Sequence, residues 1–455
     1  MSRRNFLAGA AAVGVGALGL PAHVLAEDLA LARSPETPPP ASGGTFMRGV
    51  PFAQHDVVRV AIVGTGLRGR GILRELLAID GVRVTAIADL VPDKAARANK
   101  MITDAGQPAP AVFAGTETGF EQLVQRDDID LVYTATPWEW HVPVCLAAMR
   151  NGKHAATECN AGMTLRDLWA LVDTSEATGK HCLQLENCCY GQSEMLVNRL
   201  VHAGVLGEVL HCEAAYLHDL REILFETRDE GLWRRAWHTK FNGNLYPTHG
   251  LGPVSWYLDI HNGDRFDYLV SMSSPEAGLT AHRAATIKDQ NDPRWAERYV
   301  TGDLNSSLIK TAKGRTILLQ HNVSSPRPYS RLNNVQGTKG VFEDYPPRIY
   351  VDGQAGGERF GSLDPWKAEY DHPLWKNVGE LARKTGGHGG MDFIMCWRLV
   401  QCFREGLAPD FDVYDAAAWS APFALSAMSV SRQSAPVKFP DFTRGRWNTP
   451  LVARG

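Results

Sequence analysis

Short apolar runs alternate with amphipathic segments from residue 57 to about residue 186. The runs rich in β-branched residues predict strands at 57–63, 82–88, 129–135, near Ala155 and at 181–185. Between them, apolar residues recur at helical spacing and predict helices at 69–79, 93–105 and 142–150. Strands that alternate with helices in this way are typical of a parallel, doubly wound sheet with an α/β fold.

The pattern changes after residue 187. A helix is predicted over 192–203, and alternating apolar and polar positions then predict strands at 209–217, 268–272, 305–310 and 315–322. Residues 371–432 return to helical spacing. We therefore expect two folded units: a parallel-sheet domain at 56–186, and an α/β domain at 187–455 with an open, mostly antiparallel sheet and C-terminal helices.

The N-terminus resembles a twin-arginine export signal. Arg3 and Arg4 precede a mild apolar run from Ala8 to Leu20, and Val24-Leu25-Ala26 offers a small-residue cleavage site. The alternative is a membrane anchor, but the run is shorter than the ~20 apolar residues that a span needs. We expect residues 1–26 to be a cleaved signal peptide, with export to the periplasm or beyond and no stable membrane anchor. The segment 27–55, rich in Pro and Ala, is predicted to be a linker or a surface arm.

Composition narrows the classes of partner. Lys and Arg number 47 against 50 Asp and Glu, so no general basic field favours nucleic acid.

The eight cysteines show no metal-finger spacing, and folding before export favours free, mostly buried thiols, including the adjacent pair Cys188 and Cys189. Four histidines (His211, His218, His238 and His249) lack metal-ligand spacing, so we expect no metal site. The sequence is compatible with a homo-oligomer but does not set the oligomeric state.

A glycine-rich turn follows the first predicted strand. Gly64, Gly66 and Gly69 form G-x-G-x-x-G between a strand and a helix, which suits a dinucleotide pyrophosphate at a helix N-terminus. Asp89 lies 20 residues beyond Gly69, at the end of the next strand, where a carboxylate binds the ribose hydroxyls and repels a 2′-phosphate. Leu90 stands where an NADP enzyme would carry a basic residue. We therefore expect a Rossmann domain that binds NAD.

Other polar residues follow later strands of the same sheet. The segment Thr134 to His141 contains two Trp and a His, Glu158 follows the next strand, and Asn187 follows the one after that. Loops at the carboxyl ends of parallel strands form the cofactor crevice, so these side chains are candidates to contact the nicotinamide half. A helix start or a loop cap is the structural alternative for each of them alone.

These residues resemble the glucose–fructose oxidoreductase and inositol dehydrogenase superfamily, which pairs a Rossmann domain with an α/β domain whose open sheet covers the nicotinamide. Two positions depart from its ordinary dehydrogenases. Cys159 stands where those enzymes carry a Lys, and Leu245 stands where they carry an Asp four residues before the active-site His, here His249. Both departures argue against a simple sugar alcohol dehydrogenase.

A narrower resemblance, to glycosyl hydrolase family 109, covers almost the whole chain. These enzymes are NAD-dependent α-N-acetylgalactosaminidases. The motifs that carry it occur in order: Gly66-Leu67-Arg68-Gly69, Pro137-Trp138-Glu139-Trp140-His141, Glu186-Asn187, His218-Asp219-Leu220-Arg221, Tyr246-Pro247-Thr248-His249-Gly250-Leu251-Gly252-Pro253, Ser325-Pro326-Arg327-Pro328-Tyr329-Ser330 and Gly387-His388-Gly389-Gly390-Met391-Asp392-Phe393.

The resemblance also implies roles for individual residues. The residues implied to contact NAD, besides the glycines, are Leu67, Arg68, Asp89, Trp138, Glu139, Trp140, His141, Glu158, Cys159, Asn187 and Tyr246. Those implied to line the sugar pocket are Tyr216, Arg234, Tyr246, Pro247, Thr248, His249 and Tyr329. Tyr190 and His249 are the candidates for proton transfer; a Tyr can act as a base where a nearby positive charge lowers its pKa. His388 either faces the pocket or belongs to a flexible turn.

The implied reaction is the hydrolysis of terminal α-N-acetylgalactosamine through oxidation, elimination, addition and reduction, with retention of configuration. Two alternatives remain open from the sequence. The first is an exported NAD(P)-dependent sugar oxidoreductase with net redox chemistry, and the second is a sugar-binding protein that the cofactor stabilises. The presence of Cys159 in place of the dehydrogenase Lys disfavours the oxidoreductase. The complete cofactor motif, together with the Tyr-Pro-Thr-His segment, disfavours the sugar-binding protein.

Overall fold

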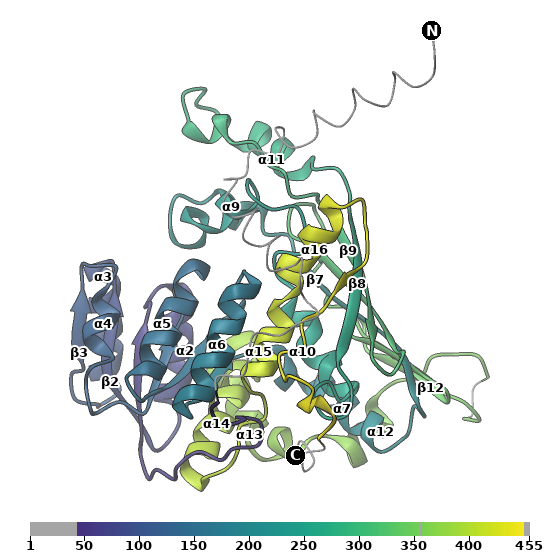
Figure 1. The fold of residues 1–455 in the computed structure, drawn as a ribbon, viewed down its shortest axis with the longest axis horizontal. Helices are drawn as coiled ribbons and strands as arrows, with labels where there is room; N and C mark the ends of the chain where they lie inside the picture. The colour runs from purple at the N-terminus through teal and green to yellow at the C-terminus, as the bar shows by residue number, and fades with distance from the viewer. Residues whose placement is uncertain (1–42, 355–356, 450–455) are drawn as a thin grey trace.

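The first sheet is fully parallel, as the alternation of strands and helices predicts. The computed structural model describes residues 43–354 and 357–449. The strands stand in the order β3-β2-β1-β4-β5-β6 (Figure 1). They are β1 (Val58–Val63), β2 (Val82–Asp89), β3 (Ala111–Ala114), β4 (Leu131–Thr134), β5 (His154–Thr157) and β6 (Cys182–Gln184). The strand order reverses between β1 and β4, the position at which such sheets bind ligands.

Helices connect these parallel strands. They are α2 (Leu67–Leu77), α3 (Pro92–Asp104), α4 (Gly119–Leu123), α5 (Trp138–Arg150) and α6 (Leu165–Thr178). Helix α5 begins four residues earlier than its apolar spacing predicts, because Pro137 occupies the N-cap and the two Trp form the first turn. The segment expected to be a loop at the cofactor crevice is therefore partly a helix N-terminus.

The second sheet is mixed and mostly antiparallel, which confirms the predicted fold class. Its order is β13-β12-β11-β7-β10-β9-β8-β14, and among the described strands of this sheet only β7 and β10 pair in parallel. The strands are β7 (Val209–Leu217), β8 (Phe266–Ser273), β9 (Asn305–Thr311), β10 (Thr316–Asn322), β11 (Asn334–Gly337), β12 (Gly340–Glu343), β13 (Arg348–Val351) and β14 (Val437–Lys438).

Some helices of the second half, among them α10 and α15, lie between the two sheets, whereas α9 and α11 lie at one end of the molecule (Figure 1). The α-helices are α7 (Gln192–His202), α8 (Arg221–Phe225), α9 (Arg234–Trp237), α10 (Thr248–Tyr257), α11 (Gly278–Thr286), α12 (Asp364–Tyr370), α13 (Pro373–Thr385), α14 (Met391–Glu405), α15 (Val413–Ser420) and α16 (Pro422–Ser431). Five 3₁₀ turns complete the described chain: η1 (Asn187–Tyr190), η2 (Asp229–Leu232), η3 (Pro293–Ala296), η4 (Gly387–Gly390) and η5 (Arg446–Asn448).

Two C-terminal helices return to the first sheet. Helix α14 packs against α2 and β1, while α15 packs against α6 and β6. The main hydrophobic core is therefore continuous between the two halves of the chain. Because α14 starts beside the glycine-rich turn, residues near position 390 reach the edge of the sheet where a ligand binds.

Residues 43–55 form a packed arm rather than a free linker. Arg48 is buried and donates to Asp412 at 2.7 Å, and the ring of Phe52 stacks on Phe403 with centroids 3.8 Å apart. The arm thus joins the N-terminal end of the described chain to helices α14 and α15. The predicted signal peptide and the remainder of the predicted linker lie outside the described residues.

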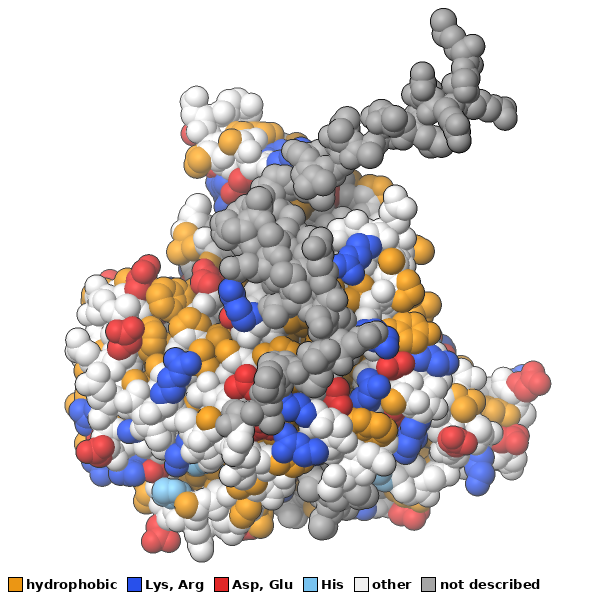
Figure 2. Space-filling model, viewed as in Figure 1, with side chains coloured by type: hydrophobic (Ala, Val, Ile, Leu, Met, Phe, Trp, Pro, Cys, Tyr) orange, Lys and Arg blue, Asp and Glu red, His pale blue; other side chains and the backbone are white. Residues whose placement is uncertain are grey.

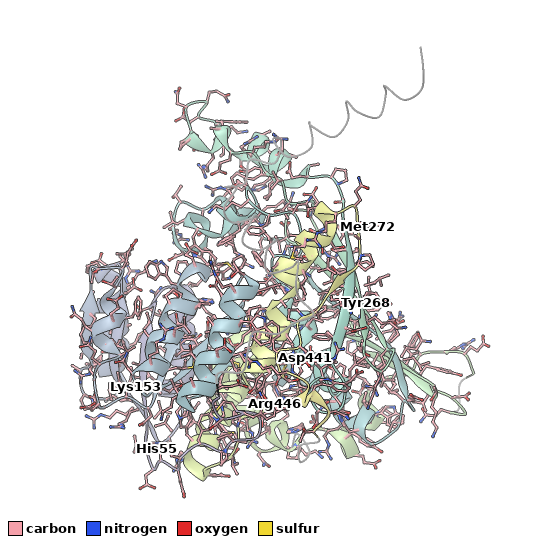
Figure 3. All side chains as sticks on the ribbon, in the orientation of Figure 1. His55, Lys153, Tyr268, Met272, Asp441 and Arg446 are labelled. Atoms are coloured by element: carbon pink, nitrogen blue, oxygen red, sulfur yellow. The ribbon has the colours of Figure 1, made fainter. Side chains whose placement is uncertain are left out.

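The surface carries both signs of charge, interspersed over the face seen in Figure 2. Tyr268 and Met272, labelled on β8 in Figure 3, are exposed on the second sheet. All eight cysteines are buried and free, as predicted. Among the described residues, no helix combines the length and the apolar character needed to cross a bilayer.

Candidate active site

The glycine-rich turn between β1 and α2 has the geometry of an anion cradle. Gly64 has φ +84°, and a Cβ at this position would lie 2.8 Å from the backbone of Ala135. Gly66 is the N-cap of α2, where no side chain caps the helix and the first turn holds no acidic residue. The first N–H groups of α2 therefore lack side-chain partners and can bind a pyrophosphate.

Asp89 lies beside this turn at the end of β2. One carboxylate oxygen accepts from the backbone N–H of Thr65 at 2.6 Å and from its hydroxyl at 2.9 Å, and the other accepts from the N–H of Val91 at 2.8 Å. Because a carboxylate offers about four acceptor positions, it can still bind ribose hydroxyls. Asp89 thus both holds the turn and faces the ligand space.

A cavity of about 620 Å³ runs along the carboxyl edge of the first sheet. It has the size expected for a small-molecule or cofactor site. Most of the residues predicted for the site line it: Gly64, Gly66, Leu67, Arg68, Asp89, Trp138, Glu139, Trp140, His141, Glu158, Cys159, Asn187, Tyr216, Arg234, Tyr246 and His249. The structure therefore brings the predicted cofactor residues and the predicted sugar residues into one continuous space.

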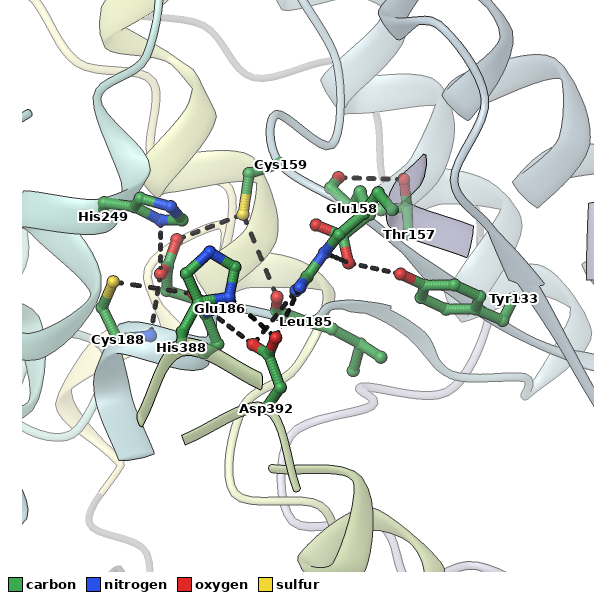
Figure 4. A network of polar contacts seen from close by, with 12 residues as sticks. Tyr133, Thr157, Glu158, Cys159, Leu185, Glu186, Cys188, His249, His388 and Asp392 are labelled. Carbon is green, nitrogen blue, oxygen red and sulfur yellow. Dashed lines mark hydrogen bonds and ion pairs between the residues drawn. The ribbon is translucent and has the colours of Figure 1, made fainter. Parts of the chain in front are cut away.

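A polar network joins the strand ends to helix α14 (Figure 4). Arg68 forms an ion pair with Glu158, with Nε 2.8 Å from the carboxylate oxygen, and donates through Nη1 to Asp392 at 2.7 Å. Asn187 donates to the other oxygen of Asp392 at 2.7 Å, and Tyr133 donates to Glu158. Burial opposes ionisation of Asp392, but the charges of Arg68 and His388 outweigh it and hold the pKa of Asp392 well below its usual range. The carboxylate of Asp392 thus stays ionised and pairs with the guanidinium of Arg68.

His388 lies at the mouth of the cavity on a strained turn. The backbone has positive φ at His388 (45°), Gly389 (72°) and Gly390 (103°), and Nδ1 meets the carboxylate of Asp392 at 2.7 Å. This hydrogen bond raises the pKa of His388, against the opposing effect of its partial burial. Of the two alternatives open from the sequence, the structure thus favours the first: His388 faces the pocket, as a group suited to donate a proton.

His249 lies deeper, at the start of α10. Its Nδ1 is 2.7 Å from an oxygen of Glu186, and its ring packs edge-on against Tyr216 and Tyr246. The thiol of Cys159 donates to the other oxygen of Glu186 at 3.2 Å. His249 is thus held by a carboxylate that is fully buried.

Aromatic rings from both halves of the chain form one wall of the cavity. Trp138 and Tyr246 stack with centroids 6.0 Å apart, and the guanidinium of Arg234 lies 5.4 Å from the first ring and 5.0 Å from the second. Arg234 also pairs with Glu230 at 2.6 Å, yet it is buried, so this pair belongs to the cavity and not to the open surface. Burial raises the pKa of the Tyr216 phenol to about 12, although Arg234 opposes the shift. These phenols stay neutral and can donate hydrogen bonds.

Tyr190 does not belong to the cavity. Its hydroxyl donates to Asp410 at 3.0 Å, and its ring packs against Trp256 and Phe411. Burial, together with the charge of Asp410, raises its pKa well above the ordinary value, which is opposite to what a base requires. The expectation that Tyr190 transfers a proton is therefore wrong, because η1 turns its side chain toward α14 and the loop that precedes α15.

Four further predicted residues stand behind the cavity wall. A Cβ on Gly69 would lie 1.9 Å from the carbonyl oxygen of Gly64, so Gly69 serves the close packing of α2 on the turn. Pro247 is the N-cap of α10, and Thr248 is buried in its first turn. Tyr329 accepts a hydrogen bond from Arg331 and packs edge-on against His218. The structure does not bring these four into the cavity lining.

The predicted set lacks Glu186 and Asp392, which bond to side chains of the site, and the acidic lining residues Glu117, Asp229 and Glu230. Glu186 immediately precedes Asn187 at the end of β6, so the strand-end logic that selected Asn187 applies to it equally. Asp392 lies in α14, and no local pattern indicates that this helix returns to the glycine-rich turn. Cys159, Glu186 and His249 also place three potential metal-ligand atoms within 4.8 Å of one another. In the structure they satisfy one another by hydrogen bonds.

Comparisons with known proteins match both halves of the chain. A family model described as glycosyl hydrolase 109, C-terminal domain, matches residues 190–449, and one described as oxidoreductase family, NAD-binding Rossmann fold, matches residues 58–185. A glycosyl hydrolase family 109 protein of Saccharopolyspora erythraea is 54% identical over 99% of this chain and 95% of its own length. One of Solibacter usitatus is 52% identical over 98% of both chains.

Solved structures share the fold at low sequence identity. A levoglucosan dehydrogenase in complex with NADH and levoglucosan superposes with a TM-score of 0.66, at 17% identity, over 84% of this chain and 99% of its own. A scyllo-inositol dehydrogenase of Lactobacillus casei superposes with a TM-score of 0.60, at 13% identity, over 85% of this chain and 99% of its own.

Proposed function

The chain belongs to glycosyl hydrolase family 109, and from that premise we propose that it hydrolyses terminal α-N-acetylgalactosaminides, with NAD as a catalytic cofactor and with retention at the anomeric carbon. The observation that carries this proposal is the shared cavity. One space is lined by the dinucleotide turn, by two histidines suited to proton transfer and by an aromatic wall suited to a sugar.

NAD is the cofactor of the Rossmann half, and the residues present fit it. The uncapped start of α2 would hold the pyrophosphate, and Asp89 would hold the adenine ribose. Bound NAD would supply reversible hydride transfer with C3 of the sugar, which makes the neighbouring C2 hydrogen acidic. Arg68, Glu158 and Asn187, fixed through Asp392, would orient the nicotinamide half.

We assign the proton transfer at C2 to His249 and those at the departing oxygen and the incoming water to His388. His249, in the interior of the cavity, would remove the C2 proton. The electron pair of the C2–H bond would form the C1=C2 double bond, and the pair of the C1–O bond would leave with the departing oxygen. After water has added at C1, His249 would return a proton to C2. His388, at the mouth, would give its proton to that oxygen and would then accept one from the water that adds at C1. The pKa of His388, raised by the hydrogen bond to Asp392, suits it to start the cycle protonated.

The aromatic wall would recognise the sugar. Tyr246 and Trp138 present apolar ring faces, and Tyr216 presents a neutral hydroxyl whose oxygen lies 3.0 Å from Nδ1 of His218. Such groups pack against the apolar face of a hexose and bind its hydroxyls. Arg234, held over both rings, would face the polar edge of the substrate.

The deciding experiment measures whether the hydrogen at C2 of the sugar is replaced by deuterium from the solvent. The protein is purified without added nicotinamide and is incubated with an aryl α-N-acetylgalactosaminide in deuterated water. We expect free N-acetylgalactosamine that carries deuterium at C2, with no net accumulation of NADH. Cleavage without label at C2 would contradict the elimination route. Steady formation of NADH from free sugar would instead favour the alternative, a sugar oxidoreductase, which shares this fold with the levoglucosan dehydrogenase.

Export through the twin-arginine pathway is part of the proposal. The sequence of residues 1–26 supports it, and a cofactor that is regenerated at each turnover suits a compartment without a nicotinamide pool. Replacing Arg3 and Arg4 together by Lys should leave the protein in the cytoplasm of a producing cell, as fractionation and immunoblotting would show. Unchanged export of this variant would contradict the proposal.

A further inference from the structure

Glu186 is a fully buried carboxylate that touches the histidine of the interior. It caps the turn η1, directly after β6, and accepts from the backbone N–H of Cys188 at 3.1 Å. The same oxygen meets Nδ1 of His249 at 2.7 Å, and the second oxygen accepts from the thiol of Cys159 at 3.2 Å. Every polar contact of this carboxylate therefore lies inside the protein (Figure 4).

The carboxylate is ionised at neutral pH. Burial alone would favour the acid form, but the interaction with His249 and the hydrogen bonds from Cys159 and Cys188 outweigh burial and lower the pKa of Glu186 to about 2. An ionised carboxylate can only accept hydrogen bonds, so Nδ1 of His249 must carry the proton that lies between them. The neutral imidazole then has its lone pair on Nε2.

Cys159 completes this arrangement with an uncharged donor. Burial raises the pKa of its thiol well above the ordinary value, and the charge of Glu186 raises it further, so the group remains a thiol. A lysine at this position would place a second cation against Glu186 and compete with His249 for it. Because Cys159 is uncharged, His249 is the only residue that can carry a positive charge among the side chains that the structure shows bonded to Glu186.

We propose that Glu186 is the positioning residue of the site: it holds His249 as the Nδ1–H tautomer and directs Nε2 into the cavity to take the C2 proton of the sugar. This inference rests on the proposed function. The bond from C2 to hydrogen breaks, the proton moves to Nε2, and Glu186 stabilises the imidazolium without itself becoming protonated. The other groups around His249 are the rings of Tyr216 and Tyr246, which stay neutral, and His218 nearby.

The variant Glu186→Gln tests this role, because glutamine keeps the shape but no longer fixes the tautomer. We expect kcat for the glycoside to fall by about 10²-fold or more, with deuterium incorporation at C2 falling in parallel. Bound NAD and KM should change little, and Glu186→Asp should recover part of the rate. Glu213→Gln is the matched control, since that carboxylate lies on β7 and accepts from Asn334. A Glu186→Gln enzyme with full rate and an unchanged pH profile would overturn the proposal.

A second measurement observes His249 in the wild-type protein and does not depend on how Glu186→Gln folds. Nitrogen-15 spectra of labelled histidine, assigned by comparison with His249→Gln, should show Nδ1 protonated and Nε2 unprotonated. The opposite tautomer would overturn the inference even in an active enzyme. Stoichiometric zinc in the purified protein, with activity lost on chelation and restored by zinc, would also overturn it by making Glu186 a metal ligand. An enzyme that fails to exchange C2 hydrogen at all would refute the proposed function, while the tautomer would still decide the role of Glu186.

Discussion

The imidazole of His388 and the carboxylate of Asp392 meet at 2.7 Å, one helical turn apart in sequence but across the boundary between a positive-φ turn and a regular helix. The turn directs His388 toward the cavity mouth, and the helix fixes its partner. If His388 is the acid, His388→Ala should slow the release of alkyl alcohols by about 10²–10⁴-fold, because these leave only with a proton. Dinitrophenol, which leaves as an anion, should be released nearly as fast as by the wild type. Equal losses for both leaving groups, measured as kcat/KM, would argue against this role.

The contact between His388 and Asp392 also leads us to predict how kcat/KM depends on pH. Asp392 raises the pKa of His388, so the protonated form persists to higher pH than it would without the carboxylate. Asp392→Asn should therefore move the alkaline limb of the kcat/KM profile to lower pH. Because Arg68 also loses its partner in this variant, bound NAD must be quantified in the same samples. An alkaline limb that stays in place, in a protein that retains NAD, would contradict the assignment.

Two glycines, Gly64 in the cofactor turn and Gly71 in the helix α2 that follows it, give a matched test of the turn. Gly64→Ala forces a side chain into positive φ and to within 2.8 Å of the backbone of Ala135, so we expect a loss of more than about 2 kcal/mol of stability together with loss of bound NAD. Gly71 lies within α2 with nothing within 4 Å of a Cβ, so Gly71→Ala should raise stability by up to about 1 kcal/mol. Thermal unfolding and the absorbance of released nucleotide measure both effects. Similar behaviour of the two variants would show that the turn does not hold the cofactor.

Asp89 should set the choice of dinucleotide. Its carboxylate repels a 2′-phosphate, and Leu90, which is exposed beside it, provides no compensating charge. We expect the double variant Asp89→Ser, Leu90→Arg to be purified with NADP, whereas the wild type carries NAD, as mass spectrometry of the extracted nucleotide would show. Leu90→Arg alone is the control and should retain NAD, because Asp89 still occupies the ribose site. Continued purification of the double variant with NAD would place the selectivity elsewhere.

The cofactor half could be predicted because its signals are local. Parallel strands end at one edge, so Gly64, Asp89, Glu158 and Asn187 had to lie close together once the strands were assigned. Strands β3 and β11 to β14 are absent from the predicted set. They have two to four residues each, and β11 to β14 lack the alternation with helices that identified the equally short β4 to β6. Short strands and turns are stabilised by contacts with residues distant in the sequence, so a local segment of sequence does not predict them.

The wrong and missing predictions at the site also arise mainly from contacts between residues that are far apart in the sequence. Tyr190 follows Asn187 by three residues, but the turn η1 directs it to Asp410, which lies 220 residues away in sequence. Asp392 entered the site because α14 packs on α2, and this contact depends on the complementarity of two helix surfaces. Glu186 is the exception, because its position at the end of β6 was itself a usable signal.

The ion pair of Arg68 with Asp392 joins residues that are 324 positions apart. A nascent chain that has emerged only as far as the parallel sheet carries Arg68 without this counter-ion. The polar network around Glu158 and Asn187 is therefore complete only after α14 has been synthesised and has packed on α2.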